Sequence, residues 1–357
     1  MGQIRQISQI AARWRWALAA ALLLAVAGTA GAADAQATGA TGAARRIVFL
    51  PQWVPQAQFA GYYMAQAKGL YAASGLDVEI RRGGQDQPPS AALEQGTADF
   101  ATMFLATALE RRNKGGIPLV NIAQIVQRSS LLLVARKSSG LASPADFNGR
   151  KVSVWPEFEV QTKALFRKFN VTPRLIPQGA TLNLFLRGGV DAASAMWYNE
   201  YHTLINTGVE EKELTVFRYD AFDLNFPEDG IYCRDETLRR DPALCRAFVV
   251  ASLEGWRQAF AQPEAALDLV MKERTAANLP ATRIHQRWML DRMHDIILPS
   301  ATGTGSSIRM AGELKTPVMG MLSADDYAVV VCELKTCGII TDAPEYGKFY
   351  ENLLFTP

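Results

Sequence analysis

Short apolar strands alternate with short helices along most of this chain, and the alternation occurs in two successive blocks. In the first block we predict strands at 46–50, 76–81, 99–103 and 119–126. In the second block we predict strands at 131–136, 151–155, 174–177 and 191–197. Strands and helices that alternate at this spacing are typical of α/β domains with mainly parallel sheets. We therefore expect an α/β fold with two lobes, each a mainly parallel sheet flanked by helices.

The last third of the chain changes to amphipathic helices. They are predicted at 241–260, 263–272, 283–294 and 323–335, the last of which begins with a Ser-x-x-Asp N-cap pattern. We expect this helical segment to pack back on the first lobe. The first lobe is then residues 45–130 and 231–357, and the second is residues 131–230. The expected hinge strands lie near 131–136 and 230–233.

The N-terminus predicts export from the cytoplasm. Three arginines precede an apolar run at 16–27, and small residues follow that run. A basic start, a short apolar core and a small-residue exit are typical of a secretory signal, and the core is too short to span a bilayer. We expect a signal peptide at 1–35, cut after Ala32 or Ala35, followed by a disordered leader at 36–44. Because no cysteine lies near the exit, we expect a periplasmic protein without a lipid anchor.

Composition and motifs argue against several classes of function. Lysine plus arginine (37) nearly balances aspartate plus glutamate (35), and no basic tract favours nucleic acid or a membrane surface. The chain has three histidines, His202, His285 and His294, and their spacing does not suit a metal site or a nucleophile. No phosphate-binding loop, nucleophile elbow or dinucleotide fingerprint occurs. We therefore expect a binding protein with no cofactor and no metal, and not an enzyme.

Four cysteines remain in the exported chain. An even number in an oxidising compartment favours disulfides, and the most local of the three pairings joins Cys233 to Cys245 and Cys332 to Cys337. Buried free thiols are the alternative, because cysteine is often simply a core residue. Metal binding is disfavoured, because no CxxC pair or nearby histidine completes a tetrahedral site.

Aromatic and polar residues follow several of the predicted strands, where ligands of open α/β sheets bind. Aromatic faces hold a flat ring by stacking, and amides and carboxylates fix its orientation. The candidate ligand-binding residues are Trp53, Gln58, Phe59, Tyr62, Gln85, Thr102, Trp155, Trp197, Asn199, Glu200 and Asp229. Local packing is the alternative for several of them. Trp53 and Phe59 could plug the next helix, and Glu200 could be an ordinary carboxylate at a helix start.

The chain resembles the binding proteins for thiamine-pyrimidine precursors, a branch of the periplasmic solute-binding proteins for nitrate, sulfonates, taurine and pyrimidines. The resemblance is carried by the segments 53–62, 67–71, 75–80, 96–100 and 141–152. It implies a type II periplasmic-binding fold, a small-molecule ligand in a cleft, and delivery to the permease of an ABC importer. It also implies ring stacking by Trp53 and Trp155, and a polar second wall of Trp197, Asn199 and Glu200.

The sequence departs from this branch at Phe59, where the branch typically has histidine. The cysteine-rich motif of the pyrimidine-synthesising relatives is also absent, which argues against synthesis. We expect a monomer that captures a small aromatic heterocycle, foremost a thiamine pyrimidine precursor. Riboflavin, sulfonates, taurine and nitrate are the alternative ligands, and delivery to a sensor is the alternative to import.

Overall fold

The computed structural model describes residues 44–84, 86–280, 282–298 and 318–354. The predicted signal peptide and nearly all of the predicted leader lie outside these residues. Among the described residues, no helix combines the length and the apolar character needed to cross a bilayer.

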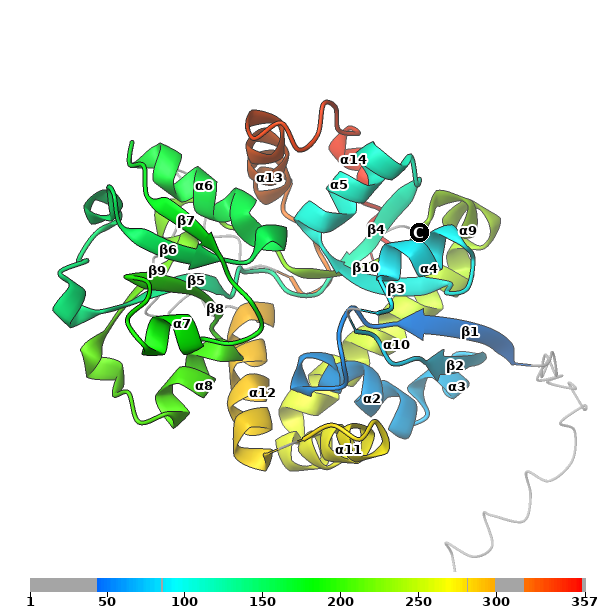
Figure 1. The fold of residues 1–357 in the computed structure, drawn as a ribbon. Coiled ribbons are helices and arrows are strands. Elements are labelled where there is room, and N and C mark those ends of the chain that lie inside the picture. Colours follow the sequence, from blue (N-terminus) through cyan, green and yellow to red (C-terminus); the bar gives the residue numbers. More distant parts are fainter. Residues whose placement is uncertain (1–43, 85, 281, 299–317, 355–357) are drawn as a thin grey trace, which may run out of the picture. The chain divides into compact units, whose positions relative to one another are not determined.

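The first sheet contains five strands in the order β2-β1-β3-β10-β4 (Figure 1). They are β1 (Arg45–Leu50), β2 (Leu76–Ile80), β3 (Phe100–Phe104), β4 (Leu119–Gln124) and β10 (Asp229–Arg234). Strands β1, β2 and β3 run parallel, whereas β10 is antiparallel to both of its neighbours. Strand β10 belongs to the chain that returns from the second sheet.

The second sheet has the same arrangement, in the order β7-β6-β8-β5-β9. Its strands are β5 (Leu131–Arg136), β6 (Lys151–Val154), β7 (Arg174–Pro177), β8 (Ala192–Met196) and β9 (Leu214–Arg218). Strand β5, which arrives from the first sheet, is antiparallel to β8 and β9. The predicted α/β fold with two sheets is confirmed. Each sheet is mixed, because it receives one strand that crosses from the other sheet and runs antiparallel to its neighbours.

The chain passes between the sheets at 125–130 and again at 219–228. The two crossover segments hydrogen-bond each other. The Ser129 amide donates to Asn225 Oδ1 at 2.9 Å, and Asn225 Nδ2 donates to the Gln127 carbonyl at 2.9 Å. The predicted hinge positions, 131–136 and 230–233, lie in sheet strands, and the connections between the sheets precede them.

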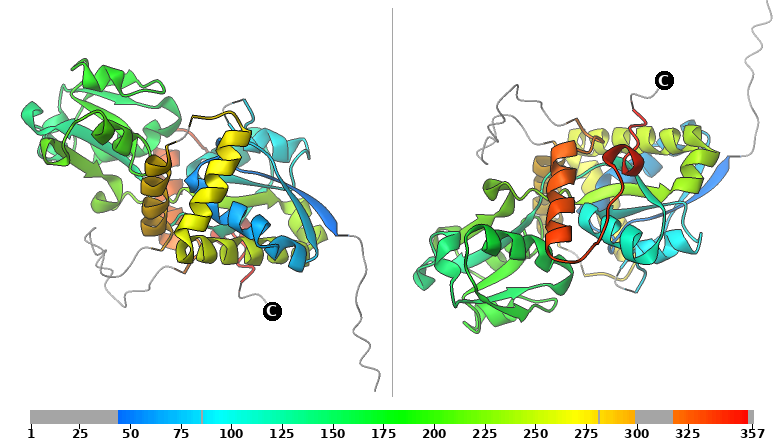
Figure 2. Two further views of the ribbon diagram at one scale, coloured as in Figure 1. Left: turned by 90° about the horizontal axis from the view of Figure 1, so that it is seen from below. Right: turned by 90° about the horizontal axis from the view of Figure 1, so that it is seen from above.

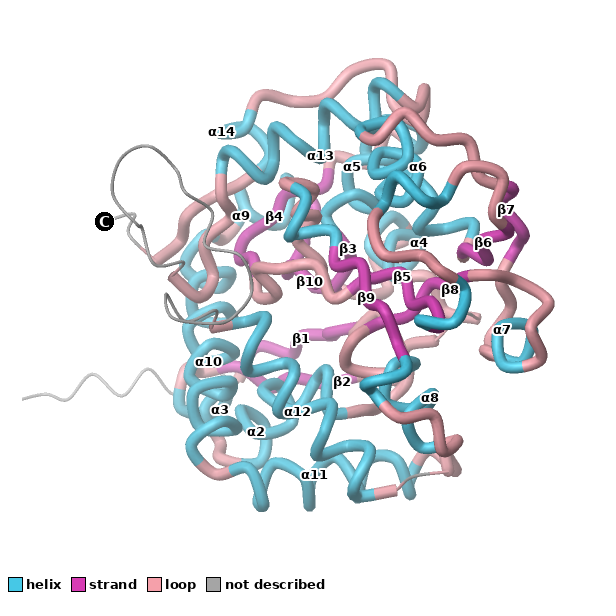
Figure 3. The backbone as a smooth tube through the Cα atoms, turned by 90° about the vertical axis from the view of Figure 1, so that its left-hand side faces the viewer, coloured by secondary structure: helices cyan, strands magenta, loops and turns pink. Residues whose placement is uncertain are grey.

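Helices cover both faces of the first sheet. They are α2 (Ala60–Ala67), α3 (Leu70–Ala73), α4 (Pro89–Glu94), α5 (Leu105–Gly115), α9 (Asp235–Arg240) and α10 (Pro242–Ala261). Helices α2 and α10 pack on one side and α5 on the other (Figures 1 and 3). The α2–α10 contact depends on two glycines. A Cβ atom on Gly255 would lie 2.2 Å from the Gly61 carbonyl oxygen, so only glycine permits this approach.

The second sheet is flanked by α6 (Glu159–Lys168), α7 (Asn183–Leu186) and α8 (Glu200–Asn206). The C-terminal helices are α11 (Pro263–Ala276), α12 (Arg283–Ile297), α13 (Ala324–Thr336) and α14 (Tyr346–Phe349). Ser323 caps α13 as predicted, because its hydroxyl accepts from the Asp326 amide at 3.2 Å. Helix α12 contacts α11 and also α8, and α13 contacts both α5 and α6 (Figure 2). The tail therefore packs on elements of both sheets, and not on the first alone.

All four cysteines are free thiols. The predicted Cys332–Cys337 disulfide is wrong for a geometric reason. Helical residues five apart are separated by about 7.5 Å along the axis, which exceeds the Cα separation that a disulfide spans. The buried thiols of Cys233 on β10 and Cys245 on α10 hydrogen-bond each other, and this contact raises the pKa of Cys233 and lowers that of Cys245.

Candidate functional site

A buried carboxylate, Asp229, organises the polar residues at the end of the first sheet. Its two oxygens accept from Gln52 Nε2 and from Gln58 Nε2, the latter at 2.8 Å. The Gln58 side-chain oxygen in turn accepts from Gln56 Nε2 at 2.5 Å. The main-chain N–H of Gln52 donates to the Thr102 hydroxyl at 2.9 Å, and this hydrogen bond joins the loop after β1 to β3. Burial raises the pKa of Asp229 to about 7.

The neighbouring carboxylate, Glu228, joins the two crossover segments. Its Oε1 atom accepts from the Ser130 amide at 2.5 Å and from the Leu131 amide at 3.2 Å, and the Ser130 hydroxyl lies 2.9 Å from both oxygens. Burial raises the pKa of Glu228 to about 8, and the proximity of Asp229 adds to this effect. Two adjacent buried carboxyl groups therefore lie where the chain passes between the sheets.

A second polar network connects α8 to α12 and ends on Glu200. Glu200 accepts from the Met196 amide at 3.0 Å and from Asn199 Nδ2 at 2.7 Å. Asn199 must then present its oxygen to His285 Nε2, which lies 2.9 Å away and is the donor. The Nδ1 atom of neutral His285 is left as an acceptor for His202 Nδ1, also at 2.9 Å. Burial is the main reason why the pKa of Glu200 is raised and that of His285 is lowered to about 4.

The indole of Trp197 is occupied by protein groups. The guanidinium of Arg218 lies 4.3 Å from its ring centroid and that of Arg292 lies 4.8 Å away. The Trp197 carbonyl also accepts from Trp288 Nε1 at 3.0 Å. This residue therefore links β8 to α12, and its ring face is not available to stack on a ligand ring.

An aromatic cluster connects the ends of β3 and β6. The Phe104 and Phe158 ring centroids lie 5.1 Å apart, and Trp155 meets Phe158 edge-on at 6.2 Å. A cavity of about 40 Å³ lies beside this cluster, which is room for one or two waters. Its lining includes the two phenylalanines and three carboxylates, Glu110, Glu157 and Glu228, and the described residues that line it include no lysine or arginine.

The structure brings several predicted site residues together and separates others. Gln58, Thr102 and Asp229 share the first network, Asn199 and Glu200 share the second, and Trp155 lies in the aromatic cluster. Trp53 has 38% of its surface exposed. Phe59 and Tyr62 are buried in the core, which is the packing alternative considered for Phe59. Gln85 lies outside the described residues.

Sequence reasoning missed three parts of this site. They are the carboxylate of Glu228, the rings of Phe104 and Phe158, and the contact between His202 and His285. Glu228 could have been noticed as an acidic neighbour of Asp229. No local pattern indicated the other two, because their partners are distant in the sequence.

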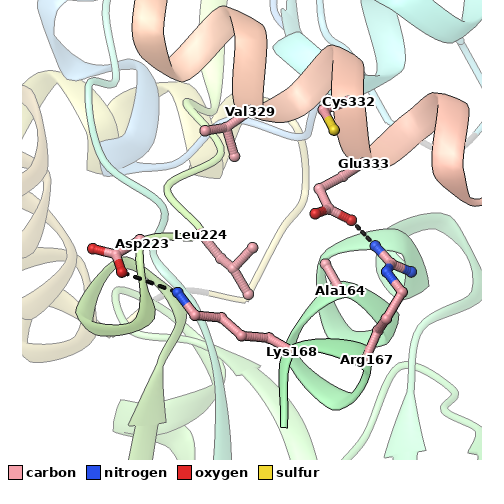
Figure 4. Close-up of a pocket in the computed structure, with 8 residues that line it drawn as sticks. All are labelled: Ala164, Arg167, Lys168, Asp223, Leu224, Val329, Cys332 and Glu333. Atoms are coloured by element: carbon pink, nitrogen blue, oxygen red, sulfur yellow. Dashed lines mark hydrogen bonds and ion pairs between the residues drawn. The ribbon is translucent and has the colours of Figure 1, made fainter. Parts of the chain in front are cut away.

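A second cavity of about 280 Å³ lies between α6 and α13 (Figure 4). Arg167 pairs with Glu333 across it, and Lys168 pairs with Asp223 at 2.9 Å. Its four charged side chains are thus already paired with one another. We therefore place the candidate site at the carboxylates and aromatic rings between the sheets.

The family described as "NMT1/THI5 like" matches residues 56–266. One similar curated protein is the riboflavin-binding protein RibY of Chloroflexus aurantiacus, 28% identical over 64% of this chain and 66% of its own length. Another is the formylaminopyrimidine-binding protein of Halalkalibacterium halodurans, 23% identical over 64% of this chain and 70% of its own length. The chain thus aligns with about two thirds of each of these relatives.

An enzyme is also among the relatives. The 4-amino-5-hydroxymethyl-2-methylpyrimidine phosphate synthase of Schizosaccharomyces pombe is 22% identical over 36% of this chain and 37% of its own length. Among solved structures, the periplasmic aliphatic sulphonate binding protein SsuA from Escherichia coli superposes with a TM-score of 0.63 and 14% identity. That superposition covers 85% of this chain and 91% of SsuA. The fold is that of the periplasmic binding proteins, with two sheets as expected.

Proposed function

This chain belongs to the NMT1/THI5-like family, and from that premise we propose that it is the solute-binding component of an ABC importer. The proposed ligand is a small aromatic heterocycle that donates hydrogen bonds, foremost an aminopyrimidine precursor of thiamine. The observation that carries this proposal is the cavity between the sheets, which combines aromatic walls with three carboxylates and has no basic residue among the described residues that line it.

The charge of this cavity favours a neutral or cationic ligand over an anion. A sulfonate or a nitrate needs hydrogen-bond donors or cations when it leaves water. Glu157 and Glu110 offer acceptors instead, although Glu110 also pairs with Lys114 at 2.9 Å. Glu228, whose pKa is raised to about 8, adds a negative charge only when it is ionised. An aminopyrimidine offers N–H donors and a flat face, which suit carboxylates and aromatic rings.

Phe158, which lines the cavity, is proposed to contact the ring together with Trp53 and Trp155. Gln52, Gln58 and Asp229 are proposed to orient it. The last five residues do not line the closed cavity, so they reach the ligand only in the open form. The cavity of about 40 Å³ is too small for a six-membered ring with substituents, so the lobes must separate to admit one. We propose that they move about the crossovers at 125–130 and 219–228. The first lobe is residues 45–130 with 231–357, and the second is residues 131–230. Closure on the solute then forms the surface that the permease recognises in the periplasm.

Thermal unfolding of the mature protein against a panel of solutes tests this function. The panel contains aminopyrimidine thiamine precursors, riboflavin, taurine, an alkyl sulfonate and nitrate. A ligand at one hundred times its dissociation constant adds about 2.7 kcal/mol, which is a shift of several degrees. We expect the shift with a pyrimidine, and we expect mass spectrometry to recover that solute unchanged.

Two variants locate the binding site. Trp155→Ala should abolish the pyrimidine shift, whereas Val250→Ala, at an exposed position on α10, should keep it. A shift with sulfonate or nitrate and none with any heterocycle would overturn the assignment of ligand class. Chemical conversion of the solute would overturn the binding role in favour of catalysis.

A further inference from the structure

We infer that the contact between α8 and α12 is a latch between the proposed lobes, and that acid releases it. The latch consists of His202 on α8 and His285 on α12, which hold one proton between their rings. This inference rests on the proposed function for what the latch controls. It adds a regulation of the same site, in which the lobes open as the pH falls.

Helix α12 is held from both sides. It contacts η1 (Ala57–Phe59), which follows β1 of the first sheet, and it contacts α8, which follows β8 of the second sheet (Figure 1). The buried side chain of Gln286 accepts from the Ala57 amide at 2.8 Å. The residue before it, His285, contacts His202 of the second lobe. Consecutive residues of one helix therefore connect the two lobes.

The hydrogen bonds of the latch determine where its protons lie. Because Asn199 Nδ2 donates to the carboxylate of Glu200 on α8, the Asn199 oxygen accepts from His285 Nε2 at 2.9 Å. The Nδ1 atom of His285 then carries no proton and accepts from His202 Nδ1 at 2.9 Å. Asn206 lies 3.2 Å from the same His202 atom, so it turns its oxygen toward that N–H. A proton on His285 Nδ1 would face the His202 N–H, and the contact would have no acceptor.

The surroundings of the latch also oppose this added proton. Burial, followed by the charges of His202 and of Arg274 on α11, lowers the pKa of His285 to about 4. Trp288 stacks on the His202 ring at 4.8 Å, and the guanidinium of Arg292 lies 4.8 Å from the Trp288 ring centroid. A protonated latch would thus place new positive charge between two arginines.

Opening the latch frees His285, whose pKa then returns to about 6.5. At pH 7.5 His285 is neutral in both forms, whereas at pH 5 only the open form holds its proton. The closed form is therefore favoured fully above pH 6.5 and progressively less as the pH falls toward 4. The ratio of open to closed molecules would rise roughly 30-fold between pH 7.5 and pH 5. Because His285 is partly exposed, screening by water reduces the expected rise to roughly 5- to 10-fold.

Distances between two spin labels measure the separation of the lobes and need no solute. The labels are attached at Val250→Cys on α10 and Leu184→Cys on α7, which are exposed positions in the first and second lobes. Cys332 and Cys337 are replaced by serine, because they are not buried. In the solute-free mature protein, we expect the longer distances to gain roughly 5- to 10-fold over the shorter ones between pH 7.5 and pH 5.

The three histidines of the chain provide the variants. His285→Asn, or His285→Gln if the first variant does not fold, should reduce the acid response to within roughly 2-fold. His294→Asn is the matched control, because His294 lies exposed on the same helix beside Asp295, and it should keep the response. The buried carboxyl groups at the crossovers are the same in all these proteins, so the comparison isolates His285.

The inference is refuted if the labels give the same distances at both pH values. It is also refuted if the acid response persists without His285 or disappears in His294→Asn. Because no solute is present, the inference and the proposed function fail separately. A panel solute that shifts thermal unfolding while the label distances ignore pH leaves the function standing and removes the latch. Acid opening in a protein that binds no solute of the panel supports the latch and removes the ligand assignment.

Discussion

The contact between His202 on α8 and His285 on α12 predicts that acid weakens this protein at one identifiable place. The pKa of His285 is lowered from 6.5 to about 4, first by burial and then by the charges of His202 and Arg274. A depressed pKa means that the folded state holds the neutral imidazole. The stabilisation is therefore complete above pH 6.5 and is lost as the pH falls toward 4.

The magnitude follows from the size of this shift. Between pH 6.5 and pH 5 the unfolded chain gains the proton and the folded chain does not, which corresponds to about 2 kcal/mol at 1.36 kcal/mol per unit. His285 is only partly buried, so screening by water reduces the expected effect to about 1 kcal/mol. Protonation also removes the acceptor that His285 offers to His202, so the α8–α12 contact is the part that loosens.

The assay must separate this effect from the buried carboxyl groups, which act in the opposite direction. The pKa values of Glu228 and Asp229 are raised, so these groups favour folding more as the pH falls. We would measure urea unfolding of the wild type and of His285→Asn at pH 7.5 and pH 5. The stability difference between the two proteins should shrink by about 1 kcal/mol at pH 5. An equal difference at both pH values would refute the reasoning, whatever the absolute stabilities are.

Three further predictions concern packing, charge and thiols. Gly255→Ala should destabilise the fold by about 3 kcal/mol in urea unfolding, because the new methyl group meets the Gly61 carbonyl; an effect below about 1 kcal/mol would contradict the close α2–α10 approach. When the pH is raised from 6 to 9, the free energy of unfolding of Glu228→Gln should rise by at least about 1 kcal/mol relative to the wild type, because the buried wild-type carboxyl must ionise. Parallel curves of unfolding free energy against pH for the two proteins would contradict this prediction. Under native conditions a thiol reagent should modify Cys332 and Cys337 quickly, and it should modify the buried Cys233 and Cys245 only after unfolding. Intact mass spectrometry counts the modified thiols, and four rapidly modified thiols would contradict the burial of Cys233 and Cys245.

Local sequence patterns predicted most strands of this fold, but they did not predict the order and direction of the strands within each sheet. The apolar run at 131–136 forms β5 with the predicted bounds, and the helix predicted at 283–294 extends slightly further, to Ile297. The orientation of β5 and β10 could not be predicted, because it depends on which sheet receives the crossing chain and not on the residues of the strand. For the same reason the hinge was predicted at the strands 131–136 and 230–233, and the crossovers that precede them were not identified.

Site residues that directly follow a strand could be predicted from the sequence. Whether an aromatic residue in the same segment is exposed or buried could not be predicted. Gln58 and Asp229 were expected from their places in the sequence, and they meet at 2.8 Å. Trp53 and Phe59 occupy the same loop and have similar side chains, yet one is 38% exposed and the other is completely buried. Their separation depends on the packing of η1 (Ala57–Phe59) against α2 and α12, which no local pattern contains.

The contacts of α12 indicate which surface separates when the proposed lobes open. On one side, α12 packs on η1 and α11, and the buried Gln286 accepts from the Ala57 amide at 2.8 Å. Fully buried apolar side chains, among them Met289 and Met293, line the same helix. Toward α8 the contacts are partly exposed, and they combine hydrogen bonds, such as His285 with Asn199, with the stacking of Trp288 on His202. Water replaces such hydrogen bonds at a net cost of about 1 kcal/mol each, whereas exposing buried apolar surface has no such compensation. On the proposed closure, α12 therefore stays with the first lobe, and the α8–α12 contact that opens is the one that acid loosens.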